Sequence, residues 1–347
     1  MNILIAGGTG YIGSHIAEDL AKHGHRITVL ARGARNGLTT SERVRELEAI
    51  GVQMVSVDLS KPGDLVQRLD PSPYEIIVQG VCSFLEPTHS ESLTIRAMQE
   101  VVAFAKGCKN VKQVIDLGNC LVLADAGNVA VPTEEFPCRP NTQHGRNKLL
   151  AEQMLQSSGL PWVILRIGQV YGGQGSSFDW VVLDGIRRGT LPLPGSGKNR
   201  VGLVHVDDVA QATRLVIEQG HRDLILNVSS SDIQVTQGDV FDCVADAFGV
   251  ARPRRIPRPI ALAYAWVSEQ MALAQKKEPE LVPDMIKVLS GSWLLSIEKA
   301  GQLLGYQPAY PDTLNGIRKA YAQVFEGKTE PFTPKGRLSS ARGVNQR

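Results

Sequence analysis

The sequence has few cysteines and nothing that suits a disulfide framework. It contains five, an odd number with no CxxC pair, at positions Cys82, Cys108, Cys120, Cys138 and Cys243. This spacing suits neither paired disulfides nor a cysteine-based zinc site. A strand pattern starts directly after Met1, with no sign of a targeting peptide. We therefore expect a reduced, cytoplasmic protein.

Long apolar runs and excess charge are also missing. The longest apolar stretch, residues 260–274, is interrupted by Ser268, Glu269 and Gln270, so it is too short and too polar to span a bilayer. We interpret it as a buried helix. The formal net charge of +2 argues against nucleic acid or a membrane surface as a partner. The histidines lack metal-ligand spacing, so we expect a small-molecule substrate and no metal.

What the sequence does contain is an alternation of strand and helix patterns over its first 230 residues. Short apolar runs typical of buried strands alternate with helical periodicity, which predicts an α/β fold with a Rossmann-type, doubly wound parallel sheet. The strand patterns cover residues 2–6, 26–30, 53–57, 75–78, 113–117 and 162–167, and the helical ones cover 10–22, 93–106 and 147–156.

The pattern changes after residue 172, where glycine and serine cluster, and residues 236–325 are mostly helical. We expect a dinucleotide-binding domain over residues 1–172, completed by elements near 201–230. A smaller, mostly helical substrate-binding domain would take residues 173–200 and 231–325. Residues 326–347 have few apolar side chains, which predicts a mobile tail.

A glycine-rich turn lies between the first strand and the first helix. It reads Gly7-Gly8-Thr9-Gly10-Tyr11-Ile12-Gly13. Glycines at this spacing permit a tight turn and let the backbone approach a pyrophosphate, while the helix N-terminus supplies N–H donors. With the required strand before it and helix after it, the turn predicts a dinucleotide site.

The end of the second strand bears on the choice between NAD and NADP. Ala31 stands where an acidic residue would bind the ribose 2′-OH, and Arg32 and Arg35 follow. Guanidinium groups suit a 2′-phosphate, which favours NADP(H) over NAD(H). The alternative is that both arginines are solvated surface charges. The other predicted cofactor contacts, at or after strand ends, are Asp58, Leu59, Gly80, Val81 and Ile167.

Together these motifs resemble the extended, epimerase/dehydratase-like branch of the short-chain dehydrogenase/reductase superfamily. The resemblance covers roughly residues 1–325 and includes the segments LRIGQVYG (165–172), VHVDDVA (204–210) and GYQP (305–308). It implies a smaller C-terminal domain over the substrate, a nicotinamide cofactor and usually a Ser/Thr-Tyr-Lys set. In that set the Tyr exchanges a proton with the substrate, the Lys holds the nicotinamide ribose, and the Ser or Thr hydrogen-bonds the reacting oxygen.

The sequence departs from that catalytic set at two of its three positions. Lys148 is in place, but His144 replaces the tyrosine and Asn119 replaces the serine. Spacing of four keeps His144 and Lys148 on one helix face. In one interpretation His144 is the acid/base, Asn119 polarises the substrate oxygen and Lys148 holds the ribose. In the other, redox chemistry is lost and NADP(H) is a scaffold or regulator.

The predicted substrate side is also unusual. Relatives that act on nucleotide sugars commonly carry an arginine at the place of Val201, whereas here Arg200 lies one residue earlier. Apolar and aromatic side chains after strand ends suggest a partly apolar pocket. The residues predicted for it are Cys82, Phe84, Gln169, Phe178 and Arg200. We interpret Asp208 as a helix cap or supporting group, and His205 as a buried structural histidine.

Three function classes remain open at this point. The first is an NADP-dependent oxidoreductase or epimerase acting on a small hydroxyl or carbonyl metabolite. The second is a non-redox cyclase, isomerase or lyase on an NADP-binding scaffold, and the third is a nicotinamide-sensing or RNA-associated protein. The resemblance also implies a possible homodimer through the helices at 93–106 and 147–156.

Overall fold

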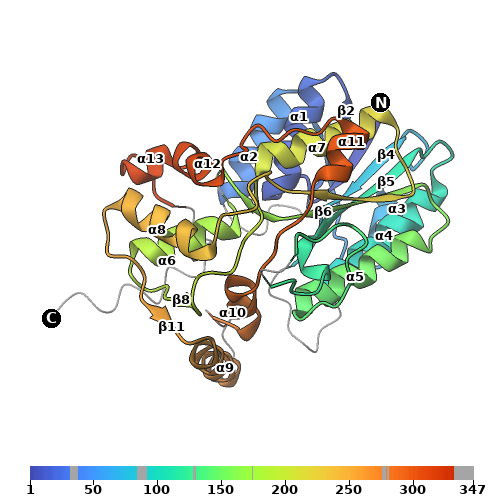
Figure 1. Ribbon diagram of the computed structural model, residues 1–347. Helices are drawn as coiled ribbons and strands as arrows, with labels where there is room; N and C mark the ends of the chain where they lie inside the picture. The colour runs from blue at the N-terminus through green and yellow to red at the C-terminus, as the bar shows by residue number, and fades with distance from the viewer. Residues whose placement is uncertain are drawn as a thin grey trace.

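The computed structural model describes residues 1–31, 38–83, 92–127, 130–173, 175–275, 279 and 281–331, with side chains from residue 43 in the second range. Its centre is a seven-stranded, all-parallel sheet in the order β10-β6-β5-β4-β1-β2-β3 (Figure 1). The strands are β1 (Asn2–Ala6), β2 (Arg26–Ala31), β3 (Gln53–Ser56), β4 (Ile76–Gln79), β5 (Gln113–Asn119), β6 (Trp162–Ile167) and β10 (Leu224–Val228).

The strand order reverses between β1 and β4, which opens a crevice at the carboxyl ends of these strands. Helices cover both faces, so successive strand residues alternate between two apolar cores. One face carries α1 (Tyr11–Lys22), α2 (Leu38–Ala49), α7 (Val206–Gln219) and α11 (Glu298–Leu304). The other carries α3 (Asp64–Arg68), α4 (Leu93–Gly107) and α5 (Gln143–Gln156). The predicted Rossmann-type α/β fold is confirmed.

A second lobe has its own apolar core and lies beyond the carboxyl end of the sheet (Figure 1). Two small two-stranded sheets belong to this region, β7 with β9 and β11 with β8. Its elements are β7 (Gln169–Tyr171), the π-helix η2 (Phe178–Leu183), α6 (Asp184–Arg187), β8 (Leu193–Pro194), β9 (Leu203–His205), α8 (Gln237–Phe248), β11 (Arg255–Ile256), α9 (Arg258–Ala274), α10 (Pro283–Ser290), α12 (Thr313–Ala320) and α13 (Ala322–Phe325).

The helix over residues 258–274 corrects one prediction. We expected a buried helix at 260–274, but α9 buries only Ala261 and Ala265, while Tyr264 is 66% exposed and Trp266 is 57% exposed. The helix turns its small side chains inward onto Ile286 and its large ones outward. No helix in the described part of the chain has the length and apolar character needed to cross a bilayer.

Candidate active site

The glycine turn is shaped by close backbone approaches. Gly7 has a φ of +82°, which favours glycine, and its carbonyl accepts a hydrogen bond of 2.9 Å from Gly10 N–H. A Cβ on Gly13 would overlap the Gly7 carbonyl. Gly10 is the N-cap of α1, so the N–H groups of the first helical turn, from Tyr11 and Ile12 onward, are presented at the crevice.

The end of β4 meets this turn. A Cβ on Gly7 would come within 3.1 Å of Gly80 C and of Val81 N, so these two backbones line one crevice. The structure therefore brings together the predicted cofactor residues of β1, α1 and β4. Ile167, at the end of β6, is buried.

The residues predicted to contact the adenosine side are only partly described. Asp58 follows β3, and its carboxylate accepts hydrogen bonds from both the N–H and the hydroxyl of Ser60. Leu59 is buried in the core under α3 and α4. Arg32 and Arg35 lie outside the described residues, so their assignment to a 2′-phosphate stays a prediction.

Helix α5 positions two of the three predicted catalytic residues. The pattern suggested that the helix begins at residue 147, but Thr142 caps it by accepting a 3.0 Å hydrogen bond from Gly145 N–H, so it begins at Gln143. Apolar periodicity does not detect the first turn because its side chains are polar or small, whereas the spacing of His144 and Lys148 already placed both on one helix. Gly145 also lets the helix approach the segment just after β5 closely, since a Cβ there would overlap the carbonyl of Leu121.

His144 is buried in this first turn, with Nδ1 at 3.0 Å from the carbonyl oxygen of Ser83. A carbonyl can only accept, so Nδ1 carries the proton. In the neutral ring Nε2 then carries the lone pair, which is the arrangement a general base needs. Ser83 lies just after β4, so β4 and α5 together fix the ring.

Lys148 lies one turn further along α5 and is also buried. Its Nζ donates a 2.6 Å hydrogen bond to the Leu117 carbonyl and lies 3.6 Å from Oδ1 of Asp116. Burial is the largest single effect and lowers the pKa of Lys148, but the nearby acidic groups, Asp116 first and Glu152 among the others, together outweigh it, so the pKa lies above its ordinary value. Burial has the opposite effect on the carboxyl of Asp116 and raises its pKa. The pair holds a positive charge beside the predicted ribose position.

Asn119 ends β5 beside these residues. Its Oδ1 accepts a 2.9 Å hydrogen bond from Leu121 N–H and caps the short helix η1 (Cys120–Val122). The amide oxygen is thereby committed to the turn. The amide nitrogen is the part of Asn119 that can donate to a substrate oxygen.

A buried ionic network under the site was missed by sequence reasoning. Arg166 of β6 pairs with Glu152 of α5 at 2.9 Å and donates to the Glu134 carbonyl. The Glu134 side chain in turn accepts from Asn227 N–H of β10. The available signal was a charged residue inside an apolar strand run, which also marks Asp116 in β5, because such positions are seldom charged without a partner.

The predicted substrate residues are spread more widely. Cys82 is exposed beside Ser83, and the Nε2 of Gln169 is buried without a hydrogen-bond partner among the described residues. Phe178 is buried in the second lobe, where its ring stacks on Tyr321. Arg200 forms a backbone bridge with Thr236. Phe84 lies outside the described residues, so a common pocket stays a prediction.

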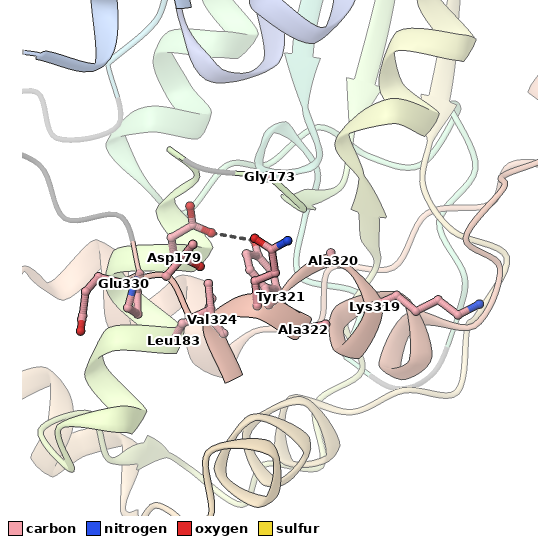
Figure 2. Close-up of a pocket in the computed structure, with 12 residues that line it drawn as sticks. Gly173, Asp179, Leu183, Lys319, Ala320, Tyr321, Ala322, Val324 and Glu330 are labelled. Atoms are coloured by element: carbon pink, nitrogen blue, oxygen red, sulfur yellow. Dashed lines mark hydrogen bonds between the residues drawn. The ribbon is translucent and has the colours of Figure 1, made fainter. Parts of the chain in front are cut away.

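A cleft of about 360 Å³ is open elsewhere, between η2 and the helices α12 and α13 (Figure 2). At its wall Tyr321 donates a 2.6 Å hydrogen bond to Asp179, the dashed line in the figure. None of the three predicted catalytic residues lines it. This cleft is therefore separate from the surroundings of His144.

The VHVDD segment has a structural role that differs in part from expectation. His205 is buried, stacks on Tyr310 and itself caps α7 by accepting from Asp207 N–H. Asp208 is therefore not the cap. It accepts from the backbone N–H groups of Ala309 and Tyr310, at 2.6 and 3.3 Å, and so holds the segment after residue 308 against α7.

Comparison with known proteins adds a family match and distant relatives. A model of the NAD dependent epimerase/dehydratase family matches residues 3–229. The chain is 24% identical over 330 residues to sterol-4-alpha-carboxylate 3-dehydrogenase, decarboxylating, of Dictyostelium discoideum, covering 88% of this chain and 95% of that protein. It is 26% identical over 326 residues to 2-alkyl-3-oxoalkanoate reductase of Shewanella oneidensis, covering 87% and 81%.

Among solved structures, the fold is similar to that of UDP-glucuronic acid 4-epimerase from Bacillus cereus in complex with UDP-glucuronic acid and NAD. The TM-score is 0.70 at 18% identity, covering 95% of this chain and all of that one (100%). At this identity the likeness establishes the fold, including the second lobe, and nothing about the substrate.

Proposed function

Because the chain belongs to the NAD dependent epimerase/dehydratase family, we propose that it is an NADP-dependent oxidoreductase in which His144 takes the place of the usual tyrosine. The observation that carries the proposal is the geometry of α5. His144 and Lys148 lie one turn apart, His144 held by the carbonyl of Ser83 in the segment after β4 and Lys148 by that of Leu117 in β5. The segment after β4 also lines the crevice that the glycine turn borders.

The bound nicotinamide would accept or donate the hydride. The chain's own residues handle the proton. In the oxidising direction the substrate hydroxyl gives its proton to Nε2 of His144 as its carbon loses hydride, which leaves a carbonyl and an imidazolium. The Asn119 amide N–H would donate to the same oxygen, and the Ser83 carbonyl stabilises the imidazolium through Nδ1–H.

Lys148 and the residues after β2 would hold the cofactor. With Asp116 keeping Lys148 charged, the ammonium can bind ribose hydroxyls while it retains its bond to the Leu117 carbonyl. The preference for NADP rests on the sequence Ala31-Arg32, which offers no carboxylate for a 2′-hydroxyl. The Bacillus cereus neighbour is a complex with NAD, so this preference is the first part of the proposal to test.

The substrate that we propose is a hydroxyl or carbonyl compound with an apolar skeleton. Two relatives support this class, since one is named for a sterol carboxylate and the other for 2-alkyl-3-oxoalkanoates. The absence of arginine at Val201, which is buried, argues in the same direction. A branched β-keto acid and its reduced hydroxy acid are therefore the first compounds to try.

The experiment measures nicotinamide absorbance with NADPH or NADH and such keto acids. Replacing His144→Gln should lower kcat by about 10²–10⁴-fold while the dissociation constant for NADPH stays within twofold or so. His23→Gln, an exposed histidine at the end of α1, is the matched control and should leave both quantities unchanged.

Two results would contradict the proposal. One is conversion of substrate irrespective of whether the cofactor is oxidised or reduced, which would favour the non-redox cyclase, isomerase or lyase. The other is normal turnover in His144→Gln. The variant His144→Tyr separates the alternatives further, because gain of ordinary reductase activity with loss of native turnover also indicates non-redox chemistry.

A further inference from the structure

Helix α9 presents large apolar side chains to solvent. Six of them are between 47% and 66% exposed, and we call them the α9 outer face: Ile260, Tyr264, Trp266, Val267, Met271 and Leu273. The fully buried residues on the side that packs on the protein are small, Ala261 and Ala265, and Leu262 is partly buried beside them. An ordinary surface helix has the reverse arrangement, with its large apolar side chains toward the core.

Four residues of the outer face form a continuous stripe, and Trp266 and Leu273 lie on the flank of the same exposed side. Ile260, Tyr264, Val267 and Met271 recur at intervals of four, three and four, so they lie one above the other. From residue 260 to residue 274 the helix rises about 21 Å. Figure 1 shows α9 at the periphery of the molecule, beside β11 and α10. An apolar stripe of this length marks a docking surface.

The charges at the N-terminal end of the stripe are basic. Arg254, Arg255 and Arg258 there are exposed, and none forms an ion pair within the described part of the chain. Beyond the other end the sequence continues with Lys276-Lys277-Glu278-Pro279-Glu280, which carries no net charge. Tyr264 and Trp266 have rings with one polar atom each, which suit a boundary between water and an apolar phase.

We propose that the α9 outer face docks on an anionic lipid surface, with the helix lying in the plane of the interface. Apolar and aromatic side chains would enter the headgroup region, and the arginines would contact lipid phosphates. A two-fold pairing of this face with a second copy would instead place its arginines opposite residues 276–280, which carry no net charge, or opposite the arginines of the other copy, and neither offers the anions that a lipid surface does. The charge pattern therefore favours a membrane surface, contrary to our expectation from net charge alone.

The proposed docking face is connected to the candidate active site through α10. Helix α10 packs on α9, and its Asp284 accepts a 2.6 Å hydrogen bond from Gln143 N–H, the first residue of α5. Lys287 of α10 donates to the carbonyl of Asn141. The segment that holds His144 is thus tied to the helix beside the lipid, on the side from which an apolar substrate would come. Docking itself does not depend on the proposed reaction.

The test is co-sedimentation of the full chain with vesicles of phosphatidylcholine alone or mixed with phosphatidylglycerol. We expect binding to the mixed vesicles that weakens as salt rises. The variants Tyr264→Ser/Trp266→Ser and Arg254→Glu/Arg255→Glu should each lower the partition coefficient by about tenfold or more. Leu303→Ser, which replaces an exposed leucine of α11, is the matched control and should bind as the parent does.

Tryptophan emission gives an independent readout. Binding should shift the emission of the parent to shorter wavelength, and Trp266→Phe should remove most of that shift while sedimentation persists. Absence of vesicle binding by the folded parent would overturn the proposal, as would equal loss in Leu303→Ser. A dimer in sedimentation velocity that Tyr264→Ser/Trp266→Ser dissociates, without any vesicle binding, would also overturn it in favour of a second copy.

Discussion

Helix α5 buries ionisable side chains, whereas helix α9 exposes large apolar ones. In α5, Lys148 and Glu152 face the sheet, where Asp116 and Arg166 meet them. In α9 the inner face holds alanines and the outer face holds the bulk. Neither helix follows the pattern of an amphipathic surface helix.

The comparison shows that the two departures serve different ends. Burying charge costs free energy of desolvation, which α5 recovers only through close partners, so its position and ionisation are strongly specified. Exposing apolar surface leaves the hydrophobic gain of α9 unrealised within this chain, so that gain is available for binding something else. In our proposals, α5 positions the residues of the reaction and α9 attaches the protein to a lipid surface.

The largest expected effect comes from removing the cation of α5. Lys148→Met leaves the Asp116 carboxyl buried without an opposite charge, and should lower the free energy of unfolding by about 3–5 kcal/mol. Urea denaturation followed by circular dichroism measures this. The double variant Lys148→Met/Asp116→Leu should recover most of the stability and none of the turnover. If the single variant is as stable as the parent, the ion pair does not specify α5.

Helix α7 extends the comparison, because it buries the carboxyl of Asp208, which forms no ion pair with any described residue. Burial raises the pKa of Asp208 to about 6. The folded state then binds a proton that the unfolded state releases, so this carboxyl makes the free energy of unfolding fall as pH rises from about 4 to about 6, by up to about 3 kcal/mol.

The measurement is the unfolding free energy of Asp208→Asn and the parent at several pH values in that window. The unfolding free energy of the variant minus that of the parent should increase as the pH rises. A difference that stays constant across the window would show that the carboxyl titrates normally.

The glycine turn shows how much the sequence alone could predict. Its residues, the sheet strands and the position of Lys148 follow local rules of turn chemistry and hydrophobic alternation, which act between near neighbours. The partners of Lys148 and His144 do not, because Asp116 and Ser83 reach the site from other strands. The same holds for α9, whose sequence is apolar on nearly every side. Its own pattern therefore does not show which side packs on Ile286 and which faces solvent.

A smaller effect should come from the inner face of α9. Ala265 is fully buried, and Ala265→Leu would force a larger side chain into the contact with α10. We expect a loss of about 1–3 kcal/mol in the free energy of unfolding from overpacking. Thermal unfolding would register it, and an unchanged midpoint would mean that α9 is loosely attached.

The neighbouring residue should give the smallest effect. Trp266→Ser removes the largest side chain of α9, yet that side chain is mostly in solvent, so the free energy of unfolding should change by no more than about 0.5 kcal/mol. Denaturant curves of the two single variants, measured side by side, make the comparison direct. A large loss in Trp266→Ser would show that its ring is part of the core.

The backbone of Gly172, between the two lobes, forms hydrogen bonds with side chains of both. The carbonyl of Gly172 accepts a hydrogen bond from the hydroxyl of Tyr11, in the first turn of α1, and its N–H donates to the hydroxyl of Tyr321, which in turn donates a hydrogen bond to Asp179. A relay of three polar groups thus joins the helix behind the glycine turn to the last helices of the chain. The nucleotide-binding half is therefore hydrogen-bonded to the last helices of the chain. A protein truncated before Tyr321 would lose the hydrogen bond that holds Gly172, and with it Tyr11, beside the glycine turn.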